Sequence, residues 1–457
     1  MNFDDDTIAA IATPLGEGGL AVIRISGARA LVVADKCFVP VGRNSSKPSV
    51  ASSHTIHYGK VVRAGKTVDE VLCAVMRAPR TYTREHVVEI TCHGGILCSK
   101  TVLDTILESG ARLAEPGEFT KRAFLNGRLD LTQAEAVLDV IHSRTDLALA
   151  AANEQLAGKL GQRINQLRDD LMNILAHIEA HLDFPDEDIA PDTRTQLEGR
   201  LDRGIAFLDE LLRTANEGQI LRSGIRAAIV GRPNAGKSSL LNQLLGHARA
   251  IVSPIPGTTR DTIEETADIR GLPVVFIDTA GLREGRDEIE AEGIRRSHAS
   301  LARAEFILQV LDASEPLTAA DENYLREFAD KQRILVCNKM DLLRKLELPA
   351  SRAPQVDVCC VSGQGIEALK DAIKTLIWSG EIKSEMLQVM INARHQDALR
   401  RARESAALTL AAMRDALPLD LVAVDLYAAV SAVGEVVGQT ATDDLLDVIF
   451  RQFCIGK

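Results

Sequence analysis

Residues 231–238, GRPNAGKS, match GxxxxGK[ST], the pattern of a phosphate-binding loop between a strand and a helix. Three more motifs follow in order: Gly257-Thr-Thr-Arg-Asp261, Asp278-Thr-Ala-Gly281 and Asn338-Lys-Met-Asp341. A lone loop would leave ATP, GTP or chance open, but each later motif supplies a different contact to one Mg²⁺-bound guanine nucleotide. The ordered set predicts a GTPase.

The apolar run 225–230 predicts a buried strand that leads into this loop, where backbone N–H groups bind the β-phosphate. We expect Lys237 to neutralise the β- and γ-phosphates, and the Ser238 hydroxyl to reach Mg²⁺. The predicted GTP-binding residues are Asn234, Ala235, Gly236, Lys237, Ser238, Ser239, Ser253, Thr258, Thr259, Asp278, Thr279, Ala280, Gly281, Asn338, Lys339, Asp341 and Ser362.

A threonine pair predicts a switch segment. A hydroxyl of Thr258 or Thr259 can reach Mg²⁺ while a backbone N–H meets the γ-phosphate. We expect Asp278 in the second shell of the metal and the Gly281 N–H at the γ-phosphate. Base selection depends on Asp341, whose carboxylate accepts the N1–H and the exocyclic amine of guanine, an edge that adenine lacks.

Leu282 stands where Ras-like enzymes place the glutamine that orients the attacking water. Another group must therefore do this, and Arg260, Arg283, Glu288 and Glu290 are candidates, although most charges in such a run are simply solvated. Asn234 could join the carbonyls of 253–258 around a monovalent cation, or it could only form the turn.

Composition limits the class of protein. The chain has 457 residues, is 46% hydrophobic and has a mean hydropathy near zero, which is typical of a globular, soluble protein of two to four domains. A net charge of −11 argues against bulk attraction to nucleic acid, so any RNA contact needs a local basic patch such as 394–403.

The cysteines and the hydropathy profile favour a cytoplasmic protein. The eight cysteines form no CxxC pair and no zinc spacing with histidine, which indicates reduced thiols. The N-terminus is acidic and no run of 18 apolar residues occurs, so we expect neither a signal peptide nor a membrane span.

The pattern changes along the chain. Short β-rich runs and one periodic helix at 96–107 predict an α+β module over 1–120. Apolar residues at steps of three and four from Leu160 to Leu182 predict a helical part over 121–217. Strands at 306–311, 334–337 and 356–361, alternating with helices, predict a parallel sheet, the G domain, over 218–378, and helices resume over 379–457.

The sequence resembles the MnmE (TrmE) family of tRNA-modification GTPases over nearly its whole length. The resemblance rests on GRPNAGKSSLLN, the leucine after Asp278-Thr-Ala-Gly281, the acidic corner 183–188, the opening segments 12–19 and 24–27, and the terminal Phe453-Cys-Ile-Gly-Lys457. It implies an α/β P-loop GTPase domain inserted in an α-helical domain, preceded by an α+β tetrahydrofolate-binding domain.

The resemblance also implies a homodimer that works with an FAD-containing MnmG-like partner in a heterotetramer. Together they would place a carboxymethylaminomethyl or aminomethyl group on C5 of the wobble uridine of certain tRNAs. A 5-formyl- or 5,10-methylene-tetrahydrofolate would contact Arg24, Glu89, Arg128 and Lys457. Cys454 is a candidate nucleophile, although the sequence supplies no base to activate its thiol.

For the missing glutamine, the resemblance implies K⁺ held by Asn234, Ser253, Ile255 and Thr258, with Glu290 positioning water. Mg²⁺ would bind Ser238 and Thr259, and Lys237, Arg260 and Glu290 form the expected catalytic set. Ser253-Pro254 departs from the family's pattern in the loop that would hold the cation, and Val361-Ser-Gly363 departs from the motif that supports guanine. Ser362 keeps the first position of that motif, so we expect guanine binding to survive with somewhat altered affinity.

An RNA-binding ribosome-assembly GTPase of the Era or EngA type is the alternative. It shares the hydrophobic residue after Asp278-Thr-Ala-Gly281, but it would carry a KH-like module with a GxxG loop after the G domain. No such loop stands out between Trp378 and Lys457.

Overall fold

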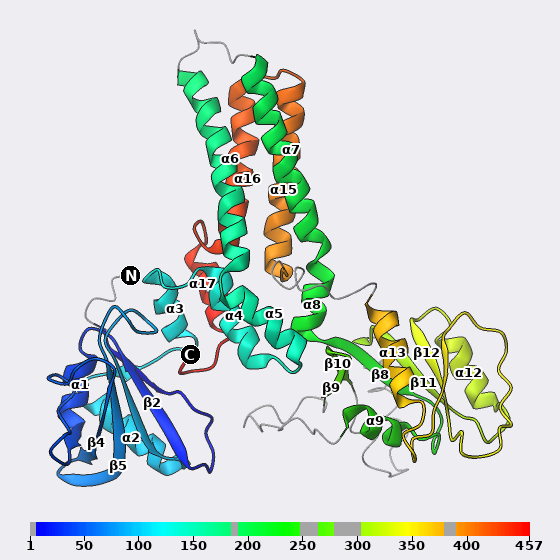
Figure 1. Cartoon of the computed structure of the whole chain (residues 1–457), viewed down its shortest axis with the longest axis horizontal. Helices are drawn as coiled ribbons and strands as arrows, with labels where there is room; N and C mark the ends of the chain where they lie inside the picture. The colour runs from blue at the N-terminus through cyan, green and yellow to red at the C-terminus, as the bar shows by residue number, and fades with distance from the viewer. Residues whose placement is uncertain (1–5, 184–190, 247–263, 278–302, 379–389) are drawn as a thin grey trace. The chain divides into compact units, whose positions relative to one another are not determined.

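The computed structural model describes residues 6–183, 191–246, 264–277, 303–378 and 390–457 (Figure 1). By contacts the chain divides into two compact units. One comprises 1–138, 161–200 and 404–457, and the other comprises 139–160 and 201–403.

The first unit contains a seven-stranded sheet in the order β3-β4-β5-β6-β2-β1-β7. All its neighbouring strands pair antiparallel except β1 and β7, which are parallel. The strands are β1 (Ile8–Ile11), β2 (Leu20–Ser26), β3 (Phe38–Pro40), β4 (Thr55–Arg63), β5 (Lys66–Met76), β6 (Val87–His93) and β7 (Arg112–Leu113).

The two faces of this sheet pack against different helices, because successive side chains of a strand point to opposite faces. Ile23 and Ile25 of β2 share one buried cluster with helices α1 (Ala30–Cys37) and α2 (Ile96–Glu108). On the other face, Phe119 of α3 (Glu118–Leu125) packs with Ile8 of β1. Arg24 alternates with the two isoleucines, so it lies on the α3 face.

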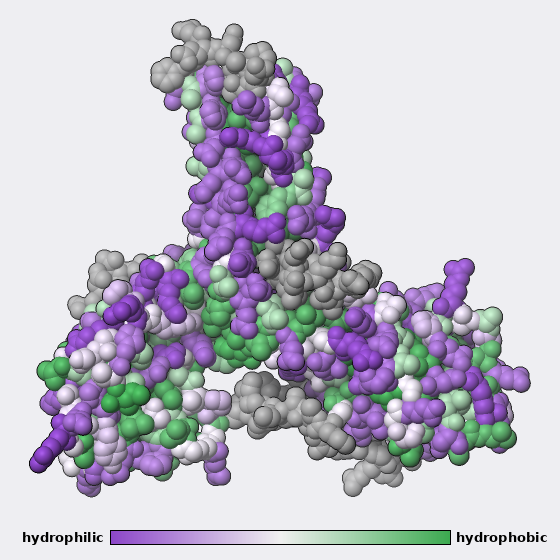
Figure 2. Space-filling model, viewed as in Figure 1, coloured by the Kyte–Doolittle hydropathy of each residue, from purple (hydrophilic) through white to green (hydrophobic). Residues whose placement is uncertain are grey.

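The remainder of the first unit consists of helices that pack against one another. The start of α4 (Leu131–His142) packs against α17 (Asp443–Phe450) in a cluster with Phe450 and Phe453. The apolar stripe predicted from Leu160 to Leu182 lies on α6 (Lys159–Asp183). A hydrogen bond from the Tyr427 hydroxyl to Glu179 joins α6 to α16 (Leu419–Val437). The outer surfaces of these long helices are mostly hydrophilic (Figure 2), as an amphipathic stripe requires.

The second unit contains a six-stranded sheet in the order β13-β12-β11-β8-β10-β9. Only β9 and β10 pair antiparallel. The strands are β8 (Ile225–Val230), β9 (Glu265–Ile269), β10 (Leu272–Phe276), β11 (Phe306–Asp312), β12 (Arg333–Asn338) and β13 (Gln355–Asp357). Helices α9 (Lys237–Leu245) and α13 (Ile366–Ile377) contribute Leu240 and Leu369 to its core.

The remaining described helices are α5 (Asp146–Leu156), α7 (Pro191–Arg213), α8 (Ala215–Ser223), α12 (Ala319–Glu327) and α15 (Ala393–Arg414). The ion pair between Arg403 and Asp209, at 3.1 Å, joins α15 to α7. The predicted fold class is confirmed in outline: an α+β module comes first, and a mainly parallel α/β sheet lies between two helical stretches of the chain.

Candidate functional site

The phosphate-loop motif lies where its pattern predicts, between β8 and α9. Gly231 has φ 146° and Gly236 has φ 99°, the backbone region that favours glycine. A Cβ on Gly231 would lie 2.3 Å from the Val310 carbonyl oxygen, and one on Gly236 would lie 2.1 Å from Asn338 Nδ2. Both glycines are therefore required for the loop to pack against the neighbouring strands.

Lys237 is the first residue of α9, and its ammonium folds back over the loop. Its Nζ donates to the carbonyl oxygens of Gly231 at 2.8 Å and of Arg232 at 2.9 Å. Burial lowers the pKa of Lys237. A half-buried cation at a helix N-terminus, beside turned-in backbone N–H groups, is suited to a polyphosphate.

Asn338 connects the loop to the predicted base-binding side. It ends β12 and is buried; its Nδ2 donates to the Ala235 carbonyl oxygen at 2.9 Å, and its Oδ1 accepts from Cys360 N at 3.1 Å. One amide side chain thus fixes three segments at the carboxyl ends of parallel strands, where α/β sheets bind ligands.

The base-side residues themselves are accessible. Asp341 is exposed and its Oδ1 accepts from the Cys359 thiol at 3.2 Å, while Ser362 is exposed on the next loop. Lys339 pairs with Asp312 at 2.6 Å. Burial raises the pKa of Asp312, but hydrogen bonds from Lys339 and Ser314 outweigh this and keep its pKa below the usual range.

The predicted loop residues and the predicted base residues therefore lie on one edge of the sheet. Asn234 is exposed on the loop with φ 62°. Ser238 and Ser239 are exposed in the first turn of α9. The remaining predicted nucleotide, metal and catalytic residues lie outside the described residues: Ser253, Ile255, Thr258, Thr259, Arg260, Asp278, Thr279, Ala280, Gly281 and Glu290.

A second polar site lies in the other unit, on the α3 face of the N-terminal sheet. Arg24 and Glu89 are directly opposite each other on β2 and β6, and Arg24 Nε lies 2.8 Å from Glu89 Oε1. Arg24 Nη1 donates to the Gly456 carbonyl oxygen at 3.3 Å. The chain terminus is therefore part of this site, and half-buried Lys457 follows directly.

Aromatic rings cover the two arginines. The Arg24 guanidinium lies 5.8 Å from the centre of the Tyr82 ring and 5.7 Å from that of Phe119, and the Arg128 guanidinium lies 4.7 Å from Tyr82. These are cation–π distances. Burial raises the pKa of Tyr82, so the phenol stays protonated.

The structure thus brings Arg24, Glu89 and Arg128 together. Lys457 directly follows Gly456, whose carbonyl oxygen accepts from Arg24. Sequence reasoning missed Tyr82, Phe119 and Gly456, since nothing in their local patterns marks them. Cys454 is exposed, and its backbone carbonyl accepts from Gly117 N at 3.4 Å.

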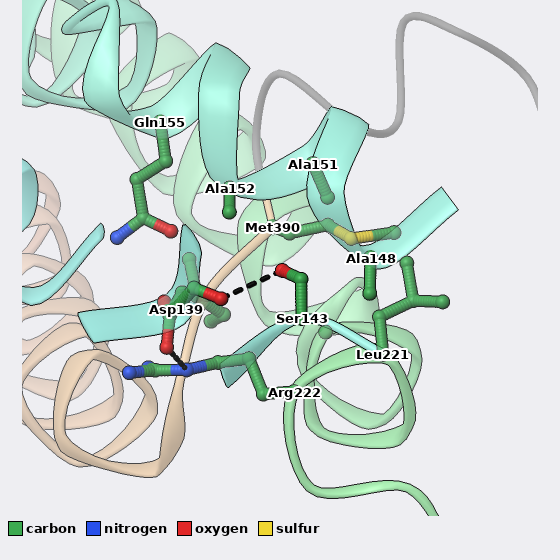
Figure 3. A pocket seen from close by; sticks show the side chains of 11 residues that line it. Asp139, Ser143, Ala148, Ala151, Ala152, Gln155, Leu221, Arg222 and Met390 are labelled. Atoms are coloured by element: carbon green, nitrogen blue, oxygen red, sulfur yellow. Dashed lines mark hydrogen bonds and ion pairs between the residues drawn. The ribbon is translucent and has the colours of Figure 1, made fainter. Parts of the chain in front are cut away.

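A cavity of about 30 Å³ lies among α4, α5, α8 and residues 390–391 (Figure 3). Small apolar side chains such as Ala148 and Ala151 line it, together with an ion pair in which Arg222 Nε donates to Asp139 Oδ1 at 2.8 Å. The space suits about one water molecule, so it holds neither a nucleotide nor a pterin. Within the described residues, no helix has the length and hydropathy to cross a membrane.

Two family models match the chain. The MnmE helical domain matches residues 131–454, and the N-terminus of the GTP-binding protein TrmE matches 7–128. Relatives named tRNA modification GTPase MnmE are 46% identical in Listeria welshimeri, over 99% of both chains, and 46% identical in Clostridioides difficile, over 100% of both. The Moorella thermoacetica relative is 47% identical, over 99% of this chain and 100% of its own.

Among solved structures, the chain is similar to the G domain of the T. maritima FeoB iron transporter, at 25% identity over 34% of this chain and 99% of that one, with a TM-score of 0.26. It is also similar to Era in complex with MgGDPNP and ribosomal RNA, at 26% identity over 39% of this chain and 66% of that one, with a TM-score of 0.26.

The loop, its lysine and the asparagine-linked base side on a mainly parallel sheet define a P-loop GTPase, an enzyme that hydrolyses GTP. The matches over the full length narrow this class further. The chain belongs to the MnmE family of tRNA modification GTPases.

Proposed function

We propose that this GTPase is K⁺-dependent and modifies C5 of the wobble uridine of certain tRNAs, adding a carboxymethylaminomethyl or aminomethyl group. It acts as a homodimer in the cytoplasm with an FAD-containing MnmG-like partner, and it uses a one-carbon tetrahydrofolate. The observation that carries the proposal is the coexistence, in one chain, of a phosphate loop and a separate arginine–glutamate–aromatic site.

At the nucleotide site, Lys237 leaves its two loop carbonyls and binds the β- and γ-phosphates. The two Lys237 hydrogen bonds support this step, because they hold the cation where it is needed and are easily exchanged for charged acceptors. Ser238 and Thr259 bind Mg²⁺, which supplies charge neutralisation when present. Asp341 accepts the guanine N–H groups, and Ser362 supports the base.

Asn234 binds K⁺ together with Ser253, Ile255 and Thr258. Support comes from its position on the phosphate loop, where the residue is exposed and has φ 62°. A polar amide oxygen is a suitable ligand for a hard monovalent ion. Glu290 positions the attacking water and Arg260 assists. These residues replace the glutamine that Ras-like enzymes have at the position of Leu282.

At the N-terminal site, Glu89 accepts the amine donors of the pterin, while Arg24, Arg128 and Lys457 face the carboxylates of the folate's glutamate part. The half-buried Tyr82 ring offers a flat, apolar surface to a conjugated ring system, and the fully buried Phe119 ring supports Arg24 from below the surface. The domain boundaries 1–120, 121–217, 218–378 and 379–457 are part of this proposal.

The ribosome-assembly alternative requires an RNA-binding module after the G domain. The described residues 390–457 form the helices α15, α16 and α17 and a short tail. A KH module needs strands and a GxxG loop, so these helices favour the tRNA-modification proposal.

Titration of the purified chain with 5-formyltetrahydrofolate tests the folate half, followed by the absorbance of the pterin. The expected result is saturable binding that is lost in Arg24→Ala/Glu89→Ala. A matched control is Lys60→Ala/Glu70→Ala, which removes another cross-strand ion pair of the same sheet and leaves binding intact. Equal folate affinity in the two double variants would refute the site.

A further inference from the structure

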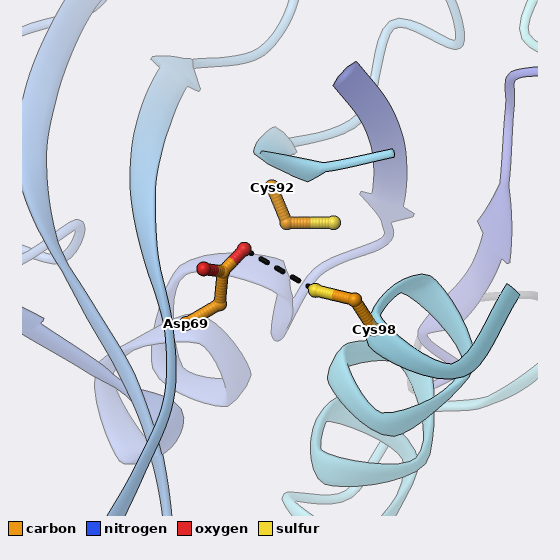
Figure 4. Close-up of side chains that lie close together, drawn as sticks. All are labelled: Asp69, Cys92 and Cys98. Carbon is orange, nitrogen blue, oxygen red and sulfur yellow. Dashed lines mark hydrogen bonds between the residues drawn. The ribbon is translucent and has the colours of Figure 1, made fainter. Parts of the chain in front are cut away.

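Three side chains converge at one end of the N-terminal sheet: Asp69 of β5, Cys92 of β6 and Cys98 of α2 (Figure 4). A carboxylate oxygen and the two sulfur atoms all lie within 4.8 Å of one another. The Cys98 thiol donates to Asp69 Oδ2 at 3.3 Å. This Asp69–Cys92–Cys98 cluster takes no part in the proposed GTP or folate chemistry.

The backbone around the cluster is fixed. Asp69 Oδ2 accepts from His93 N at 2.8 Å, so the carboxylate binds the end of β6 directly. On the other side, His93 pairs with Leu20 of β2, and Gly94 packs so closely that a Cβ there would lie 2.3 Å from the Gly18 carbonyl oxygen. The donor atoms are thus held by rigid elements, as a metal site requires.

One side of the cluster is buried and the other faces solvent. Cys92 is 1% exposed and the Asp69 side chain is 12% exposed. The exposed His93 ring lies beside the cluster, with Nδ1 at 2.8 Å from Asp69 Oδ1. An ion bound here would meet mostly buried ligand atoms.

Two sulfurs and one carboxylate form a donor set for a borderline-soft divalent ion. Zinc binds thiolate sulfur at about 2.3 Å and carboxylate oxygen at about 2.0–2.2 Å, so the ligands of one tetrahedron lie roughly 3.5–4 Å apart. The Asp69 oxygen and the two sulfur atoms, which lie within 4.8 Å of one another, need to move only slightly closer to reach these distances. Hard ions such as Mg²⁺ and Ca²⁺ prefer sites made of oxygen ligands.

We propose that Asp69, Cys92 and Cys98 bind one zinc ion, with water at the fourth position. Binding releases the two thiol protons to solvent and involves no change of oxidation state. Burial, together with the nearby Asp69 carboxylate, raises the pKa of Cys98, and burial raises the pKa of Cys92 to about 12, so the zinc ion must displace both thiol protons. His93 is a positioning residue, because its ring lies at hydrogen-bond distance from Asp69 Oδ1, and such outer partners orient ligating carboxylates.

The test uses the full chain, reduced, nucleotide-free and stripped of metal, with excess Mg²⁺ present. Co²⁺ serves as the spectroscopic probe for zinc. We expect one equivalent to give a thiolate-to-cobalt charge-transfer band and tetrahedral d–d bands, both removed by added Zn²⁺. His93→Ala should keep the bands but weaken affinity by roughly 10–100-fold.

Cys98→Ser should lose the charge-transfer band. The matched control is Cys37→Ala, since Cys37 is a buried thiol of the same unit that donates to carbonyl oxygens of its own helix; it should keep the band. If Cys98→Ser fails to fold by circular dichroism, Asp69→Asn takes its place and should lose tight Zn²⁺ binding. Absence of the band in the parent chain, its persistence in Cys98→Ser, or unchanged Zn²⁺ affinity in Asp69→Asn would each overturn the proposal.

Discussion

At the scale of single residues, we propose that Asp341 selects the base. Asp341→Asn should weaken GTP binding by roughly 10²-fold or more, because the guanine donors lose their acceptor. The variant should instead bind xanthosine triphosphate, whose base carries an oxygen in place of the amine. The control is Asp357→Asn, which changes an exposed carboxylate on β13 of the second unit's sheet. Unchanged GTP affinity in Asp341→Asn, measured by equilibrium titration, would contradict the assignment.

We predict that Asn234 and Glu290 act in the hydrolysis step. GTP turnover should be faster in K⁺ than in Na⁺, and Asn234→Ala should remove this difference because a cation ligand is lost. Equal rates of the parent chain in the two salts would refute the cation model.

Glu290→Ala should lower kcat by roughly 10²–10⁴-fold with little change in nucleotide Kd, since a carboxylate that orients water acts mainly in the transition state. Steady-state kinetics and nucleotide titration separate the two quantities. Normal turnover with weakened binding would indicate a structural charge.

Residue identity predicted the nucleotide site better than the folate site. The motif at 231–238 specifies its own backbone, since its glycines have the φ values that the loop needs. Arg24 and Glu89 were assigned only through family resemblance. Their pairing depends on the β2–β6 register. Tyr82 and Phe119 come from other segments, and no local sequence pattern connects those segments to Arg24 or Glu89.

At the scale of elements, a buried arginine holds α3 to the sheet. Arg122 is 1% exposed and lies 2.9 Å from Glu118 and 3.0 Å from Glu85. Arg122→Ala should lower the free energy of unfolding by about 3–5 kcal/mol, because it leaves carboxylates buried without this partner. Arg84→Ala, at an exposed arginine that donates to the Asn126 carbonyl oxygen, should cost far less. Similar denaturation midpoints for the two variants would contradict this role.

The same network makes stability depend on pH. Burial raises the pKa of Glu118, but hydrogen bonds from Arg112, the Glu115 N–H and Arg122 outweigh it and hold the pKa below the usual range. Its contribution is therefore complete above the ordinary carboxyl pKa and is lost as pH falls through the lowered value. Glu118→Gln should flatten the acid limb of the unfolding free energy; an unchanged limb would exclude this carboxylate as a cause.

Element positions were predicted well where periodicity was long. The predicted helix 96–107 is α2 at Ile96–Glu108, and the predicted strand 225–230 is β8. The predicted strand 356–361 was too long, since β13 covers only Gln355–Asp357. Val358 and Cys360 are apolar because they enter the core from a turn, in which Gly363 N donates to the Cys359 carbonyl oxygen.

At the scale of the whole molecule, one chain combines a GTPase with the proposed one-carbon site. Sequence spacing could not reveal the Asp69–Cys92–Cys98 cluster, because its members come from two strands and a helix and form no CxxC pair. The terminal residues likewise gain meaning only where the Gly456 carbonyl oxygen meets Arg24. Long-range pairing of this kind depends on the fold and not on local pattern.

Nucleoside mass spectrometry of total tRNA tests the central claim most directly, in a strain that lacks the chromosomal gene and carries one variant at a time. Lys237→Ala should abolish GTP turnover but spare folate binding, and Arg24→Ala/Glu89→Ala should do the reverse. Both should leave the wobble uridine without its C5 group, whereas the parent chain and Lys60→Ala/Glu70→Ala restore it. Full modification with the folded Arg24→Ala/Glu89→Ala chain would contradict the account.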